Sequence, residues 1–152
     1  MVAALLALLV ITLPNTKATV SVDDGWKPAA APSIVAAYRG PRGETLAVTR
    51  AQVPNADAWR EKTRIAYIDA IERGALSAIR GAKRVSHVVG DASGVPALDL
   101  EVKRDDGATI VLRYLLFRTY ALALAIEVPK GVDPKPARTI AESFTVGAEA
   151  RR

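Results

Sequence analysis

The chain of 152 residues contains no cysteine. It therefore has no disulfide framework, no thiolate zinc site, no iron–sulfur cluster and no cysteine nucleophile. His87 is the only histidine, which excludes a histidine metal cluster and leaves one ring for any catalytic triad. Its neighbour Ser86 would point to the opposite face of a strand, so we interpret His87 as a partly exposed strand residue.

Motifs for nucleotide binding and for hydrolysis are also absent. There is no G-x-S-x-G, no P-loop and no G-x-G-x-x-G that opens a helix. The remaining acid–base candidates are the strand carboxylates Asp99, Glu101 and Glu127 and the turn residues Asp105 and Asp106. Turn and ion-pair roles account for all five, so the sequence predicts no enzyme and no catalytic, cofactor or metal residues. A carboxylate-dependent hydrolase stays open as an alternative if two of the strand carboxylates converge in a pocket.

Positive charge is not concentrated anywhere in the chain. The formal net charge is +5, but no run of five basic residues occurs and no glycine–aromatic RNA-binding signature accompanies the arginines. We therefore expect no nucleic-acid partner. Asp23-Asp24-Gly25 is interpreted as a turn, because no further oxygen ligands follow at calcium-loop spacing.

An apolar run from Val2 to Leu13 opens the chain and ends at Pro14. Twelve residues are too few for a helix that spans a bilayer, which needs about 20. The run is typical of a signal peptide, with Thr16-Lys17-Ala18 as a cleavage site, although no basic segment precedes it. The sequence thus predicts a signal peptide over 1–18, a secreted or periplasmic envelope domain over 19–146, and no membrane span after removal. The alternative is a first strand or helix of the domain itself.

Two stretches with a period of two, Ile110–Leu116 and Tyr120–Val128, predict strands in the middle of a sheet. The residues between the large ones are mostly uncharged too, including Ala121, Ala123 and Ala125, so both faces of the sheet are expected to be covered. Five further strands are predicted at Thr19–Val22, Ile34–Arg39, Thr45–Ala51, Val85–Val89 and Val95–Lys103, with a loop over Gly90–Gly94.

The hairpin between the last of these and Ile110–Leu116 has a predicted register. A three-residue loop, Asp105–Gly107, pairs Leu100 with Leu112 and sets Asp99 opposite Arg113. A two-residue loop would place a charge on the apolar face instead, because a one-residue slip turns every side chain over.

Two helices complete the expected fold. The first begins at Asn55 as its N-cap and ends at Gly74, and a short second helical turn over Ala75–Arg80 is left open. The residues expected to face the sheet are Trp59, Thr63, Ala66, Tyr67 and Ala70, and those expected to face water include Arg60, Glu61, Arg64 and Glu72. The second spans Asp133 to Phe144, with Asp133 as N-cap and Pro134 as its first helical residue. Its apolar stripe consists of Ala137, Ile140, Ala141 and Phe144. Residues 147–152 are expected to form a frayed tail.

This order of elements resembles the PsbP-like (Mog/PsbP/DcrB-type) α/β/α sandwich. The residues that carry the resemblance are Val22–Trp26, Gly94–Asp99, Tyr120–Pro129 and Ala141–Phe144, and the match covers about residues 19 to 146. They are packing and turn residues with no catalytic signature. The resemblance implies a largely antiparallel sheet of six or seven strands between helices, and a binding protein without a shared active site.

The sequence therefore predicts a non-enzymatic envelope domain that binds a protein partner through a sheet edge or an uncovered face. A cytoplasmic chaperone or adaptor of the same fold, for apolar effector segments, is the alternative. The identity of the partner and the oligomeric state are left open.

Overall fold

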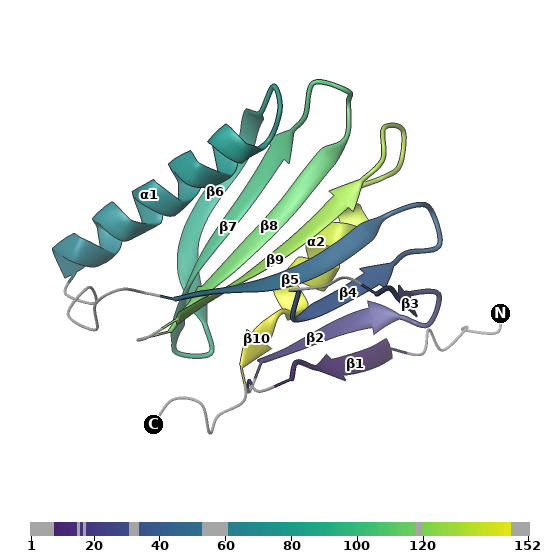
Figure 1. The fold of residues 1–152 in the computed structure, drawn as a ribbon, viewed down its shortest axis with the longest axis horizontal. Coiled ribbons are helices and arrows are strands. Elements are labelled where there is room, and N and C mark those ends of the chain that lie inside the picture. The colour runs from purple at the N-terminus through teal and green to yellow at the C-terminus, as the bar shows by residue number, and fades with distance from the viewer. Residues whose placement is uncertain are drawn as a thin grey trace, which may run out of the picture.

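The computed structural model describes residues 8–14, 16, 18–30, 34–52, 61–117 and 120–146. Within these ranges the chain forms a seven-stranded antiparallel sheet, β3-β4-β5-β9-β8-β7-β6, a three-stranded sheet, β1-β2-β10, and two helices (Figure 1). The strands are β1 Leu8–Thr12, β2 Ala18–Asp23, β3 Lys27–Pro28, β4 Ala36–Arg39, β5 Thr45–Gln52, β6 Lys83–Ala92, β7 Val95–Lys103, β8 Thr109–Leu116, β9 Tyr120–Val128 and β10 Thr145–Val146, and the helices are α1 Glu61–Ala78 and α2 Lys135–Ser143. The predicted α+β sandwich is confirmed.

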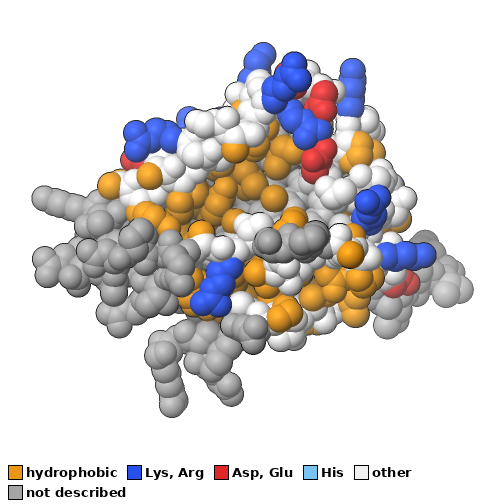
Figure 2. Space-filling model, viewed as in Figure 1, with side chains coloured by type: hydrophobic (Ala, Val, Ile, Leu, Met, Phe, Trp, Pro, Cys, Tyr) orange, Lys and Arg blue, Asp and Glu red, His pale blue; other side chains and the backbone are white. Residues whose placement is uncertain are grey.

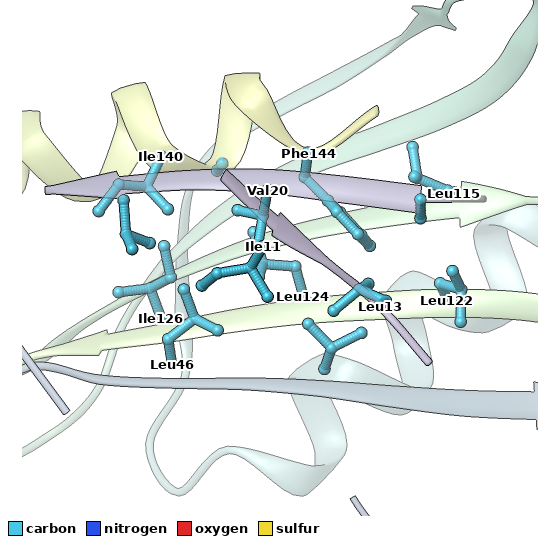
Figure 3. Close-up of a cluster of buried hydrophobic side chains, with 14 of the residues drawn as sticks. Ile11, Leu13, Val20, Leu46, Leu115, Leu122, Leu124, Ile126, Ile140 and Phe144 are labelled. Carbon is cyan, nitrogen blue, oxygen red and sulfur yellow. The ribbon is translucent and has the colours of Figure 1, made fainter. Parts of the chain in front are cut away.

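The large sheet has a different cover on each face. On one face, Ile68 of α1 packs with Leu98, Leu100 and Val102 of β7 and with the alternate residues of β8. On the other face, α2 and the small sheet enclose the larger core, with Phe144 fully buried (Figures 1 and 3). The second layer is therefore part helix and part sheet.

The first strand is the outer strand of the small sheet. β1 pairs with β2 from Leu8 opposite Asp23 to Thr12 opposite Thr19. Ile11 and Leu13 enter the core, whereas Leu9 and Val10 are 46% and 60% exposed. In the structure, β1 is thus a strand of the domain, which is the alternative to a signal peptide that the sequence left open. Because β1 is an outer strand, its removal would not divide the small sheet. Its position therefore does not decide whether residues 1–18 are a signal peptide, and the signal peptide stays a prediction.

The predicted register of the β7–β8 hairpin is confirmed. Leu100 lies opposite Leu112, and Asp99 lies opposite Arg113. Gly107 has φ +89°, which supplies the left-handed residue that a three-residue loop requires. Apolar matching on one face and an ion pair on the other thus select the same pairing.

In the preceding hairpin, β6–β7, the first strand is longer than predicted. Gly90–Gly94 was expected to be a loop, but β6 continues to Ala92, and only Ser93 and Gly94 form the turn. Both turn residues have positive φ, 55° and 88°, as a tight two-residue hairpin turn demands. Strand β6 pairs with β7 from Lys83 to Ala92, with a bulge at Val85, and it is the outer strand of the large sheet.

The predicted end of α1 at Gly74 is wrong. The helix continues to Ala78, and the chain then turns at Gly81, which has φ +63°. The predicted buried stripe of this helix is also partly wrong, because Ala66 and Ala70 are exposed. The side chains of α1 and the turn after it that pack on the sheet are Tyr67, Ile68, Ile71, Ala75, Leu76 and Ile79. The predictions for Asn55, Trp59, Arg60 and Arg64 lie outside the described backbone or side chains.

Helix α2 carries the predicted stripe. Ala137, Ile140 and Ala141 are buried, and Phe144 follows at the end of the helix. The helix starts one position later than predicted: Pro134 occupies the N-cap position, and the carboxylate of Asp133 accepts a hydrogen bond from the backbone N–H of Lys135 at 3.0 Å. The predicted tail, 147–152, lies outside the described residues.

A glycine inside α1 allows a direct test of the revised helix. A Cβ at Gly74 would meet no atom within 4 Å. Gly74→Ala should therefore raise the free energy of unfolding by about 0.5–1 kcal/mol, as for an exposed helix interior. The measurement is urea denaturation. Gly107→Ala is the control, since its φ of +89° and the close side chain of Lys130 predict destabilisation. Destabilisation by Gly74→Ala would contradict the continuous helix.

Candidate functional site

An open groove runs beside α1 on its face of the large sheet. Hydrophobic side chains gather in a hollow between α1 and the strands β9 and β5, with charged side chains at one end (Figure 2). The groove has a volume of about 450 Å³. It is lined by Thr45, Ala47, Ala78, Ile79, Arg80, Arg104, Ile110, Leu112, Ala125 and Glu127. Hereafter this is called the α1 groove.

Small side chains make the floor of the α1 groove. On β5, Leu46 and Val48 point into the core beneath α2, so Thr45 and Ala47 point to the α1 side. On β9, Leu124 and Ile126 likewise point away from α1, which leaves alanines on its side. The small residues of this face are Thr45, Ala47, Thr49, Ala51, Ala121, Ala123 and Ala125. Methyl groups fill little space above the sheet, and a hollow results.

The sequence contained a signal for this groove that was interpreted differently. The alternating uncharged alanines of β9 predict that this face of the sheet is covered as well as the other. Ala121 is buried, but Ala123 and Ala125 are only half-buried among the described residues. The alanine side of β9 is therefore covered only in part.

The charged side chains at one end of the groove form ion pairs with one another. The guanidinium of Arg104 donates to Asp106 at 2.7 and 3.0 Å and to Glu127 at 2.6 Å. The bond from Arg104 lowers the pKa of Asp106 to about 2. Arg80 lies 3.4 Å from Asp105. The α1 groove is thus an apolar surface with an ion-paired polar rim at one end.

Each of the three strand carboxylates lies in an ion pair, and the pair of Asp99 with Arg113 is the one whose partner the sequence predicted. Asp99 Oδ1 lies 3.3 Å from Arg113 Nε, and Glu127 contacts Arg104. Arg138 donates to both oxygens of Glu101, at 2.6 and 2.7 Å. Each carboxylate is therefore held by a different arginine.

Asp99 and Glu101 share a small pocket, whereas Glu127 is on the opposite face of the sheet. The pocket has a volume of about 240 Å³ and lies beside α2, with Ser86 and Arg138 in its wall. Burial raises the pKa of Asp99, the charge of Arg113 opposes this, and Glu142 adds to it. Because both oxygens of Glu101 accept hydrogen bonds from Arg138, the pair does not present two free carboxylates.

A cluster around the buried Glu72, which the sequence did not predict, joins α1 to β6. Glu72 was placed on the wet side of the helix, which is wrong, since it is 7% exposed. Arg84 of β6 donates to its Oε1 at 2.9 Å, and His87 Nδ1 lies 2.5 Å from its Oε2. His87 is a partly exposed strand residue, as predicted. The cluster fastens the helix to the outer strand.

No family model matches the sequence, and no curated protein matches it. Several solved structures are similar in fold. Cyanobacterial PsbP (CyanoP) from Synechocystis sp. PCC 6803 has a TM-score of 0.61 at 15% identity, with 97% of this chain and 96% of that chain covered.

Two other bacterial proteins show a similar likeness. LpqN of Mycobacterium tuberculosis, described as involved in cell envelope biogenesis, has a TM-score of 0.61 at 13% identity and coverages of 92% and 90%. PA94 of Pseudomonas aeruginosa, a protein of unknown function suspected to be a regulator, has a TM-score of 0.52 at 16% identity and coverages of 92% and 96%. None of the three is described as an enzyme.

The strand order, the two helices and these likenesses define an α+β sandwich with a largely antiparallel sheet. More specifically, the chain has the PsbP-like fold, so the resemblance inferred from the sequence is confirmed at the level of the fold. In the part of the chain that is described, neither helix is long and apolar enough to cross a membrane.

The Glu72 cluster predicts how stability depends on pH. Burial raises the pKa of Glu72, but Arg84 and His87 together lower it below its ordinary 4.5. A carboxyl with a lowered folded-state pKa stabilises the fold above pH 4.5 and loses this contribution as the pH falls through the folded value.

The stability difference between the wild type and Glu72→Gln should therefore be present at pH 7 and shrink steadily below pH 4.5. Urea denaturation across this range measures it. Asp69→Asn, at an exposed carboxylate of the same helix, is the matched control. A difference for Glu72→Gln that stays constant down to pH 3, or about that value, would show that the cluster does not hold the helix.

Proposed function

We propose that the chain is a non-enzymatic, envelope-associated domain that binds a protein partner in the α1 groove. The observation that carries the proposal is the groove itself, an apolar hollow of about 450 Å³ with small residues on its floor. Apolar concave surfaces with a polar rim are the usual form of recognition sites.

The occupant that fits this groove is an amphipathic helix of the partner. Helix α1 packs on β7 and β8, and the neighbouring strands β9 and β5 have small side chains on the same face. A second helix beside α1 would complete the helical layer, and alanines allow its backbone to approach closely. Its apolar side would cover Ala47 and Ala125, and its polar side would face water.

Envelope association rests on two independent lines of support. The apolar run Val2–Leu13 is typical of a signal peptide. A protein of the same fold, LpqN, is described as involved in cell envelope biogenesis. A fold alone does not fix a location, so the supporting argument is the combination of the two.

The second candidate is an intracellular adaptor of the same fold, and one observation favours it. Ile11 and Leu13 of the predicted signal peptide are buried in the core, and β1 pairs with all but one residue of β2. Cleavage after Ala18 would remove these contacts and leave β2 as an outer strand. The envelope domain therefore requires that β1 is removed with the signal peptide, whereas the intracellular adaptor requires that β1 is retained.

Partner binding can be tested by filling the α1 groove. Ala47→Phe places a ring above the floor, and it should lower recovery of the partner from an envelope extract about tenfold, equivalent to roughly 1.4 kcal/mol of binding. The measurement is quantitative mass spectrometry after capture on the immobilised domain.

Ala70→Phe is the matched control, because Ala70 is exposed on the water side of α1. It should capture the partner as well as the wild type does. Equal recovery with Ala47→Phe and with the control would show that the partner binds elsewhere.

Processing of the amino terminus distinguishes the two candidates. If 1–18 is a signal peptide, the mature protein from the envelope fraction should begin at Thr19. Intact-mass measurement of the protein purified from its source cells decides this. An intracellular protein that retains Val2–Leu13 would instead support the adaptor.

A further inference from the structure

The outer strand β6 is a long edge of the large sheet. It pairs with β7 on one side, and no described strand lies on the other. It is ten residues long and contains no proline. Its three outward-exposed valines are Val85 at 57%, Val88 at 57% and Val89 at 51%. A long edge strand offers a row of unpaired backbone groups to another strand.

The opposite edge of the same sheet is protected. There the outer strand β3 has only two residues, and one of them is Pro28, which has no N–H to donate. On β6, the protection consists of a bulge at Val85, where the register with β7 shifts between Arg84 and Ser86, and of the charged residues Lys83, Arg84 and Asp91 near the two ends of the strand. The regular edge therefore extends from Ser86 to Ala92.

We propose that β6 pairs with β6 of a second copy of this chain, so that two large sheets form one continuous antiparallel sheet. The distribution of charge along β6 favours a second copy of the same strand as its partner. The strand has Lys83 and Arg84 at its beginning and Asp91 near its end. Antiparallel pairing brings the first half of each strand, from Lys83 to His87, toward Asp91 of the other copy, and the register below sets His87 opposite Asp91.

Two-fold symmetry fixes which registers are possible. A two-fold axis perpendicular to the sheet keeps each face continuous, so every residue meets one of the same parity, and a single residue lies on the axis. With Val89 on the axis, the regular run Ser86–Ala92 pairs along its whole length and the bulge stays outside it. His87 then lies opposite Asp91, and Val88 lies opposite Gly90.

The structure leaves room for this register. His87 and Val89 lie opposite Leu100 and Leu98 of β7, so they point to the α1 face. The two copies of Val89 would meet there, flanked on each side by a His87–Asp91 pair. On the other face, Val88 would cover Gly90 of the partner copy, where a Cβ meets no atom within 4 Å. Main-chain hydrogen bonds would hold the pair, and the valines would exclude water.

The test begins with the mass of the full chain in solution. Light scattering after size exclusion, over a concentration series, should give about twice the chain mass of 16.1 kDa. Val89→Lys places two charges face to face on the axis and should return the mass to that of one chain, with unchanged circular dichroism. The matched control, Val10→Lys, alters a valine that is 60% exposed on β1 and should leave the dimer intact.

The absence of cysteine allows the register to be tested separately. A lone Val89→Cys lies on the axis, within the Cα separation of about 4.4–6.8 Å that a disulfide needs, and should oxidise to a covalent dimer. Val88→Cys is similarly exposed but lies roughly 8 Å from its copy by strand geometry, and it should not. A monomer at every concentration, a dimer that survives Val89→Lys, or cross-linking through residue 88 instead of 89 would each overturn the proposal.

Discussion

The buried guanidinium of Arg113 joins the central sheet to the C-terminal helix. Its Nη1 donates to the carbonyl oxygens of Ala141 and Glu142 at 3.0 and 2.7 Å, in the last turn of α2. The carbonyl of Ala141 also accepts a hydrogen bond from the backbone N–H of Phe144 at 3.1 Å, and the helix dipole favours a cation at this end. A buried charge is costly without such partners, and Asp99 supplies the remaining counter-charge. The register of β7 and β8 decides that Arg113 reaches α2, since a slip of one residue would turn it to the other face.

The parts of the fold that follow from local rules could be predicted from the sequence. Alternation in β7, β8 and β9 and the stripe of α2 are properties of single segments, and the register of one hairpin follows from its turn and its apolar match. The errors have a different origin. Gly74 and Gly90 look like stops, but a helix and a paired strand continue through them, because tertiary packing outweighs a cost of about 1 kcal/mol. Glu72 is buried only because Arg84 and His87 arrive from another element.

The candidate site was harder to predict because it depends on how much of the sheet the helix covers. Seven strands spaced about 4.8 Å apart span roughly 29 Å, whereas one helix is about 10–12 Å across. A single helix therefore cannot cover the α1 face. The alanines Ala123 and Ala125 indicate where little space is filled, but the sequence alone does not tell whether another element lies above them. The position of α1 over β7 and β8, and not over β9 and β5, answers that question.

The two surfaces that remain available lie in different parts of the large sheet. The floor of the α1 groove is formed over β5 and β9, whereas β6 is separated from β9 by two strands (Figure 1). Pairing through β6 would leave the groove open, and filling the groove would leave β6 unpaired. Glu72 connects the two regions, because it holds α1, one wall of the groove, to His87 and Arg84 of the edge strand. A change in the position of β6 would thus shift α1, the helix that forms one wall of the groove.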